Sequence, residues 1–468
     1  MKNRREFLKV ALGSSAMMLM AACAPAQPQA PGEKAGAQPT EAPRQEAPAT
    51  LAGASLRLWL LKTYVEPTNK AIEASAQEWA KKNNATVTVE YFTFEDMQTK
   101  YVAAIETNST PDIGQLETGA PIRFAGMGQL VELTQFARQV EGTIGRPFEP
   151  FRPVVITPDG KQVAIPWYSM HAFWYVWRDV LEKKNLKLPD TYEDALNVAT
   201  AVTDPNNNFY GIGQAWNRTS DGYGVMQSLM YSYGASWADN EGKYRSIKTP
   251  QMQAAMAWAT DIYKGDLSPP DTLSWTGSQN NENFIAKNIA QTSNGPSITY
   301  AMENAVAKAT DAADKKQKEA ALEQVVALQH PAGPDGRRSW AVAMSAGIFK
   351  SARNPDAAMS LVEWLLAPDQ QVRVMQESYG QFAPSLDKTA EASKEYFSKN
   401  ENYRRFGEAG RFFAPTGWPG PVTAPAAEVQ ASNVLTDMPA KVIVDKWPVD
   451  QALDWGEKKI KEIYETLG

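Results

Sequence analysis

Three tryptophans of this sequence stand in polar or turn-rich segments, where no core needs to be filled. They are Trp216 in GQAWNRTSDGYG, Trp275 in DTLSWTGSQNN and Trp418 in PTGWPGP. An indole at such a place offers a flat apolar face and one N–H donor. It can stack on the apolar C–H face of a pyranose ring. Packing beneath a surface loop is the alternative for each of the three.

Polar side chains that can hydrogen-bond sugar hydroxyls follow the ends of predicted strands. They are Thr63 after LRLWLL, Glu117 and Thr118 after TPDIGQL, and Asn294 and Ser297 after NIAQTS. Ligands of open α/β sheets bind beyond the carboxyl ends of the strands. These five residues are therefore candidate ligand contacts, and for Glu117 a solvated loop charge is the alternative.

The elements that must position these residues alternate between strand and helix. Residues 56–61 form an apolar run of strand length, and ATVTVEYF alternates as a strand does. Between them, helical spacing places Ile72, Ala76, Trp79 and Ala80 on one face. Strand, helix and strand at this spacing predict a βαβ unit and a mostly parallel sheet.

The rest of the chain is predicted to be mainly helical, with recognisable helix starts. Thr191 and Asp194 match a capping box. Thr249 and Asn354 each precede a proline, which suits the first position of a helix. Residues 308–323 are rich in Ala, Lys and Asp and predict a solvated helix and loop.

The first 22 residues have the anatomy of an export signal peptide. Basic side chains precede the apolar stretch from Val10 to Ala22, which is too short to cross a bilayer stably. The pair Arg4 and Arg5 resembles a twin-arginine signal. An ordinary Sec signal that carries two arginines is the alternative.

Cys23 is the only cysteine among 468 residues, and it follows the apolar stretch directly. The sequence MAAC at residues 20–23 resembles a bacterial lipobox, so we expect lipidation of Cys23 and a membrane anchor. A buried free thiol is the alternative. Residues 23–50 are rich in Pro, Ala and Gln and predict a disordered tether behind the anchor.

Composition excludes several classes of function. A net charge of −6 argues against nucleic acid as a partner. Two histidines, His171 and His330, and one cysteine are too few for the usual kind of zinc site, so no metal is expected. No Gly-rich phosphate loop and no Gly-x-Ser-x-Gly motif occur, and no cofactor is expected. Composition alone leaves a glycosidase carboxylate pair open.

Three stretches of the sequence carry motifs in a characteristic order and spacing. Residues 163–213 carry a strand ending in Ile-Pro, an Arg-Asp helix, a Leu-Pro-x-Thr helix start and a Tyr-Gly turn. In residues 283–297, Asn-Gly-Pro follows a strand. Residues 331–385 carry a return strand, an Asn-Pro-Asp helix start and a later Gly-x-x-x-Pro. Together they resemble extracellular solute-binding proteins of ABC importers, in the maltose and oligosaccharide-binding class, and the resemblance covers roughly residues 55–460.

The resemblance implies an α/β protein with the type II periplasmic-binding-protein fold, in which two lobes close on a ligand by a hinge. The first lobe would hold residues 51–166 and 345–388, and the second would hold residues 167–344 and 389–468. A crossing between the lobes near Pro166 would place Tyr168 and His171 at the ligand cleft.

The resemblance also implies a function in sugar transport rather than catalysis. We expect a monomeric substrate-binding lipoprotein on the outer face of the cytoplasmic membrane, which captures a carbohydrate and delivers it to permease subunits. The same fold with glycerol phosphate, a polyamine or a peptide as ligand is an alternative. A secreted polysaccharide-degrading enzyme and an adhesive lipoprotein are further alternatives.

Overall fold

The computed structural model describes residues 51–467, except for the side chains of Phe94 and Glu95. The predicted export signal, the lipidation of Cys23 and the tether lie outside these residues. Among the helices of the described residues, none combines the length and the apolar character that a membrane span needs.

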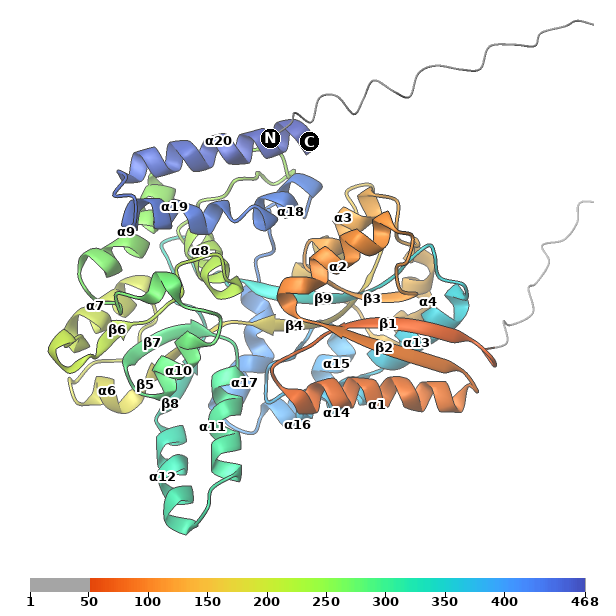
Figure 1. Ribbon diagram of the computed structural model, residues 1–468, viewed down its shortest axis with the longest axis horizontal. Coiled ribbons are helices and arrows are strands. Elements are labelled where there is room, and N and C mark those ends of the chain that lie inside the picture. Colours follow the sequence, from red (N-terminus) through yellow and green to blue (C-terminus); the bar gives the residue numbers. More distant parts are fainter. Residues whose placement is uncertain (1–50, 468) are drawn as a thin grey trace, which may run out of the picture. The chain divides into compact units, whose positions relative to one another are not determined.

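The described chain contains a six-stranded sheet with the strand order β10-β4-β9-β3-β1-β2 (Figure 1). Its strands are β1 (Ser55–Leu61), β2 (Thr86–Phe92), β3 (Ile113–Glu117), β4 (Ile165–His171), β9 (Ala341–Ile348) and β10 (Ala383–Pro384). Strand β1 pairs in parallel with β2, which confirms the predicted βαβ unit. We call this sheet and its helices the six-stranded lobe.

The helices of the six-stranded lobe lie on both faces of its sheet, with α1 and α14 on one side and α2 and α3 on the other (Figure 1). They are α1 (Glu66–Lys82), α2 (Phe94–Glu106), α3 (Ala120–Gly126), α4 (Thr134–Ile144), α5 (Arg152–Val155), α13 (Pro355–Leu366) and α14 (Pro368–Gln376). Helix α1 buries the predicted face of Ile72, Ala76, Trp79 and Ala80.

A second sheet has the strand order β6-β7-β5-β8. Its strands are β5 (Phe173–Trp177), β6 (Tyr210–Ile212), β7 (Ile289–Asn294) and β8 (Val325–Leu328). The helices between them are α6 (Arg178–Glu182), α7 (Tyr192–Val202), α8 (Ser220–Ser232), α9 (Pro250–Lys264), α10 (Gln279–Ile285), α11 (Ser297–Ala307) and α12 (Ala312–Glu323). We call this part the four-stranded lobe.

The C-terminal part of the chain is helical. It contains α15 (Asp387–Ala392), α16 (Lys394–Phe397), α17 (Glu401–Glu408), α18 (Ala424–Ala431), α19 (Val434–Ile443) and α20 (Val449–Leu467). Helices α18 and α19 pack on α20, and α19 and α20 contact helices of the four-stranded lobe. These last three helices therefore extend that lobe.

Local helix signals in the sequence are confirmed. The Thr191 side chain and Asp194 form a reciprocal capping box at the start of α7. Thr249 caps α9 and Asn354 caps α13, each accepting a hydrogen bond from a backbone N–H. Helix α12 buries none of its residues, as its composition predicts.

The prediction of a mostly parallel sheet is wrong, because both sheets are mixed. Strand β9 runs antiparallel to β3 and β4, and β5 runs antiparallel to β7 and β8. The chain returns from the other sheet to form β9. This strand lies between β3 and β4 and runs antiparallel to both of them. Such non-local returns leave no trace in local sequence periodicity.

Two short connections join the sheets. Ala172 alone separates β4 from β5, and residues 329–340 join β8 to β9. A third path runs from β10 through α15 and α16 to α17, which contacts both β10 and β8. The described residues belong to one compact unit, so the predicted lobe boundaries at residues 166, 344 and 388 stay a prediction.

Candidate functional site

The ends of three strands meet where the two sheets join. Strand β4 ends at His171 and β5 begins at Phe173, with only Ala172 between them. Strand β7 ends at Asn294, which lies opposite Phe173 in the β5–β7 pair. Strand β3 ends at Glu117 and is separated from β4 by β9 alone. In open α/β sheets, ligands bind at such convergent strand ends.

A cavity of about 280 Å³ lies between the two lobes beside this junction. The six-stranded lobe contributes Glu117 and Arg123 to its lining, and the start of α8 contributes Tyr223. Trp340 and Arg218 complete its aromatic and charged groups. This volume lies just below the range of about 300–1,000 Å³ that is typical of small-molecule sites.

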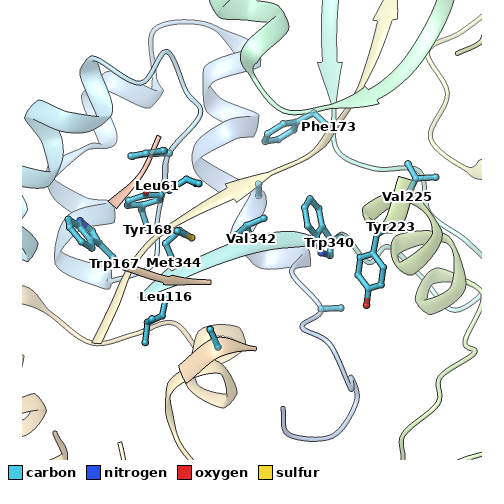
Figure 2. Close-up of a cluster of buried hydrophobic side chains, with 14 of the residues drawn as sticks. Leu61, Leu116, Trp167, Tyr168, Phe173, Tyr223, Val225, Trp340, Val342 and Met344 are labelled. Carbon is cyan, nitrogen blue, oxygen red and sulfur yellow. The ribbon is translucent and has the colours of Figure 1, made fainter. Parts of the chain in front are cut away.

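Trp340 is a residue of this cavity that sequence reasoning missed. Its backbone N–H donates a hydrogen bond to Ser228 Oγ at 2.8 Å, and its side chain is 8% exposed. The indole lies on Gly224 of α8, where an added Cβ would come within 2.6 Å of the ring. Figure 2 shows Trp340 between Val342 of β9 and Tyr223 of α8. A glycine inside a helix was the available signal, because it indicates a close approach.

Glu117 lines the cavity from the end of β3. Its Oε1 accepts a hydrogen bond from Gln98 Nε2 at 2.6 Å. Burial raises the pKa of the Glu117 carboxyl to about 7, against a smaller lowering effect of the Gln98 hydrogen bond. Near neutral pH, Glu117 therefore exchanges between a carboxylate and a neutral acid that can donate a hydrogen bond.

The two threonines that sequence reasoning selected hold strand ends in place. Thr118 Oγ1 accepts the Ala343 N–H at 3.0 Å, which ties the end of β3 to β9. The Thr63 N–H donates to Asn69 Oδ1 at 3.0 Å, and the Thr63 carbonyl accepts from Asn69 Nδ2 at 3.0 Å. Both side chains are buried, and their roles as ligand contacts stay predictions.

Tyr168 and His171 both lie on β4 and are buried. The Tyr168 ring stacks on Phe382 with centroids 3.5 Å apart, and its hydroxyl accepts a hydrogen bond from Gln115 Nε2 at 2.8 Å. His171 Nε2 lies 2.8 Å from Ser169 Oγ, while Nδ1 has no hydrogen-bond partner among the described residues. Burial lowers the pKa of His171 to about 3, so its imidazole is neutral at physiological pH.

Asn294 and Ser297 belong to a polar cluster at the end of β7. Ser297 Oγ donates to Asn294 Oδ1 at 3.1 Å, and Asn281 Nδ2 donates to Ser297 Oγ at 2.9 Å. Asn294 also hydrogen-bonds Asn281. A Cβ on Gly295 would lie 3.7 Å from the His171 carbonyl oxygen, so the cluster lies beside the junction of the sheets. Sequence reasoning missed Asn281, which α10 brings to the cluster.

Trp216 and Trp275 pack inside the four-stranded lobe, at 1% and 2% exposure. Trp216 lies edge-on to Trp258, with centroids 6.4 Å apart. The Trp275 ring would be 2.9 Å from a Cβ added to Gly213. Neither lines the cavity, and neither has an open face in this conformation. Their roles in stacking on a ligand stay predictions, and neither tryptophan belongs to the cavity lined by Trp340.

Trp418 is half-buried beside α8, away from the residues that line the cavity. Its ring lies 5.3 Å from that of Tyr231, and the Arg338 guanidinium stands 4.8 Å above it. This cation occupies one approach to the indole face. Ligand stacking on Trp418 also stays a prediction.

A family comparison identifies the class of protein. The model of bacterial extracellular solute-binding proteins matches residues 63–372 of the chain. The chain belongs to this family. Members of this family are extracellular substrate-binding proteins of transport systems rather than enzymes. No curated protein matches the chain. Among the side chains that the structure describes, no three of His, Cys, Asp or Glu gather as a metal site.

Solved structures of solute-binding proteins share the fold. A Thermotoga lettingae ABC transporter solute-binding protein, bound with α-D-tagatose, is 17% identical with a TM-score of 0.72 and covers 88% of this chain and 100% of its own. Maltose-bound T. maritima MalE3 is 20% identical with a TM-score of 0.70, at the same coverages. The GacH receptor of Streptomyces glaucescens, solved with acarbose, is 17% identical with a TM-score of 0.71, covering 89% and 100%. These matches confirm the type II periplasmic-binding-protein fold.

Proposed function

We propose that this solute-binding protein captures a carbohydrate in the cavity between its lobes and delivers it to the permease subunits of an ABC importer. The observation that carries the proposal is the position of Trp340, whose indole lines the cavity together with polar groups of both lobes. A sugar needs a flat aromatic surface for its C–H face and polar groups for its hydroxyls.

The polar groups that accompany Trp340 suit this ligand class. Glu117 accepts hydrogen bonds from sugar hydroxyls when ionised, and Ser220 and Thr219 line the opposite wall of the cavity. The structural neighbours solved with tagatose, maltose and acarbose lend support to a carbohydrate ligand.

Hinge closure is part of the proposal. Ala172 is the whole connection between β4 and β5, so a small change in its backbone angles reorients one sheet relative to the other. Attachment to the outer face of the cytoplasmic membrane rests on Cys23 and on the sequence pattern around it. We propose no chemistry at the site, and the ligand leaves unchanged.

A thermal-shift screen with neutral and acidic mono- and oligosaccharides, polyamines, glycerol phosphate and peptides tests the ligand class. A ligand that binds only the folded state at a hundredfold excess over Kd adds about 2.7 kcal/mol of stability. We expect a shift with carbohydrates. Shifts confined to amines, phosphates without sugar, or peptides would overturn the carbohydrate proposal, and no shift at all would reopen the adhesive and enzymatic alternatives.

Isothermal titration of Trp340→Ala with the best sugar tests the site itself. We expect affinity to fall by about 1–3 kcal/mol, the range for loss of one anchoring aromatic side chain. Trp340→Phe should retain most of it. Trp447→Ala is the matched control, because Trp447 is half-buried beyond α19 and is not part of the cavity. Unchanged affinity in Trp340→Ala would refute the assignment of this site.

A further inference from the structure

The charged groups of the cavity are unevenly matched. Its lining contains two cations, Arg123 and Arg218, and one carboxylate, Glu117. The two arginines come from opposite lobes, since Arg123 lies on α3 and Arg218 lies just before α8. The chain as a whole carries a net charge of −6, so an excess of cations at this cavity is a local feature.

Arg218 is neutralised by a partner outside the cavity lining. Its Nε lies 2.8 Å from Asp437 Oδ1, and its Nη2 lies 2.9 Å from Asp437 Oδ2. This is the two-point geometry that a guanidinium forms with a carboxylate. Arg218 therefore contributes hydrogen-bond donors to the cavity lining but little net charge.

Arg123 has no such partner. It is half-buried, and none of the ion pairs or side-chain hydrogen bonds of the described residues involves it. Its side chain lines the same cavity as Glu117, yet the two do not form an ion pair. A guanidinium stays charged at every physiological pH and is the residue type best suited to two-point binding of a carboxylate or phosphate.

Glu117 does little to offset this charge. Burial holds its pKa near 7, so close to neutrality a large fraction of the carboxyl is protonated. A neutral Glu117 also does not repel an acidic ligand and can donate a hydrogen bond to it. The unpaired positive charge of Arg123 therefore dominates the cavity at and below pH 7.

We propose that the ligand is an acidic sugar, and that Arg123 determines specificity by binding its anionic group while the sugar ring lies against Trp340. This inference rests on the proposed carbohydrate function. The anionic group is a carboxylate, as in a uronic acid, or a phosphate, as in a sugar phosphate. Both offer the oxygen pair that a guanidinium recognises.

Matched ligand pairs test the proposal by calorimetric titration of the purified protein. The pairs are glucuronate with glucose, galacturonate with galactose, their short oligomers, and glucose 6-phosphate with glucose. We expect the acid member of at least one pair to bind tenfold or more tightly than its neutral partner, with the advantage shrinking as salt increases. The preferred acid identifies a carboxylate or a phosphate as the natural group.

Substitution of Arg123 assigns the preference to this residue. We expect Arg123→Gln to remove the advantage of the acid member over its neutral partner within each pair. Arg138→Gln is the matched control, because Arg138 lies on α4 of the same lobe and outside this cavity. If both variants without ligand melt at the same temperature as the wild type, their folding is intact.

Two results would overturn the proposal and leave the carbohydrate function standing. One is binding of neutral sugars as tightly as or more tightly than their acid partners. The other is an acid preference that survives Arg123→Gln. Failure of every sugar in the wider screen, acidic and neutral, would instead overturn the carbohydrate function and this inference together.

Discussion

Gly119 lies at a contact between the two lobes, and an added methyl group there should hinder closure. An ideal Cβ on Gly119 would lie 2.9 Å from Ala427 Cβ and 3.5 Å from Ala427 Cα. Gly119 precedes α3 of the six-stranded lobe, and Ala427 is in α18 beside the four-stranded lobe. The backbone of Gly119 has φ −91° and ψ −17°, which alanine adopts without strain. Gly119→Ala therefore changes the contact and not the local conformation.

The expected loss of ligand affinity in Gly119→Ala follows from the distance between the added Cβ and Ala427. Carbon atoms prefer a separation of about 3.5–4.0 Å, so at 2.9 Å the α3–α18 contact must open by roughly half an ångström or more. Overpacking of this kind costs about 1–3 kcal/mol. The cost applies to the conformation in which the lobes touch, so it appears in the ligand affinity when ligand binds that conformation. We expect Kd to rise by roughly 5- to 150-fold in Gly119→Ala.

Titration calorimetry on the wild type and three variants separates this effect from general destabilisation. Ala427→Gly in the Gly119→Ala background removes the opposing methyl group and should restore most of the affinity. Gly126→Ala is the control within the same helix, because an added Cβ there meets no atom within 4 Å. Wild-type affinity in Gly119→Ala, or no recovery in the double variant, would refute a ligand-bound state closed at this contact.

Two further predictions concern pH and the membrane. Burial lowers the pKa of His171 and His330 to about 3 and raises the pKa of Glu117 to about 7 and of Asp221 to about 6. Between pH 6 and 5 the unfolded chain binds more protons at the histidines and the folded chain binds more at the carboxyls, so the two effects oppose each other. The free energy of unfolding of the wild type, measured with urea, should be nearly independent of pH in this range. That of the double variant Glu117→Gln/Asp221→Asn should fall by about 2–3 kcal/mol per pH unit on acidification. Equal pH dependence in the two proteins would contradict these pKa values. Cys23→Ser should move the exported protein from the membrane fraction to the soluble fraction, and membrane retention of the exported variant would count against lipidation.

The parts of the fold that depend on local sequence could be predicted. Helix caps such as Thr191 with Asp194 involve residues three apart, and the buried face of α1 follows from helical spacing. The βαβ unit follows from two strands and the helix between them. The mixed direction of the sheets could not be predicted in this way, because β9 enters its sheet only after the chain has built most of the other lobe.

The candidate site shows the same limit. Glu117 lines the cavity because it follows a strand end, which the sequence displays. Trp216 and Trp275 have polar neighbours along the chain but are buried in the fold. Trp216, for example, packs against Trp258, which is distant in sequence. Trp340 was missed because its position depends on contacts between distant segments. It directly precedes β9, and its ring packs against Gly224 of α8, where a side chain would collide with it.

The position of a bound sugar is the most direct test of the site. A crystal structure of the protein with the tightest-binding carbohydrate from the screen would locate it. We expect the sugar ring against the Trp340 indole, in the cavity that Glu117 and Tyr223 also line. A sugar bound elsewhere, for example on opened faces of Trp216 and Trp275 with Trp340 uncontacted, would contradict the proposed ligand face.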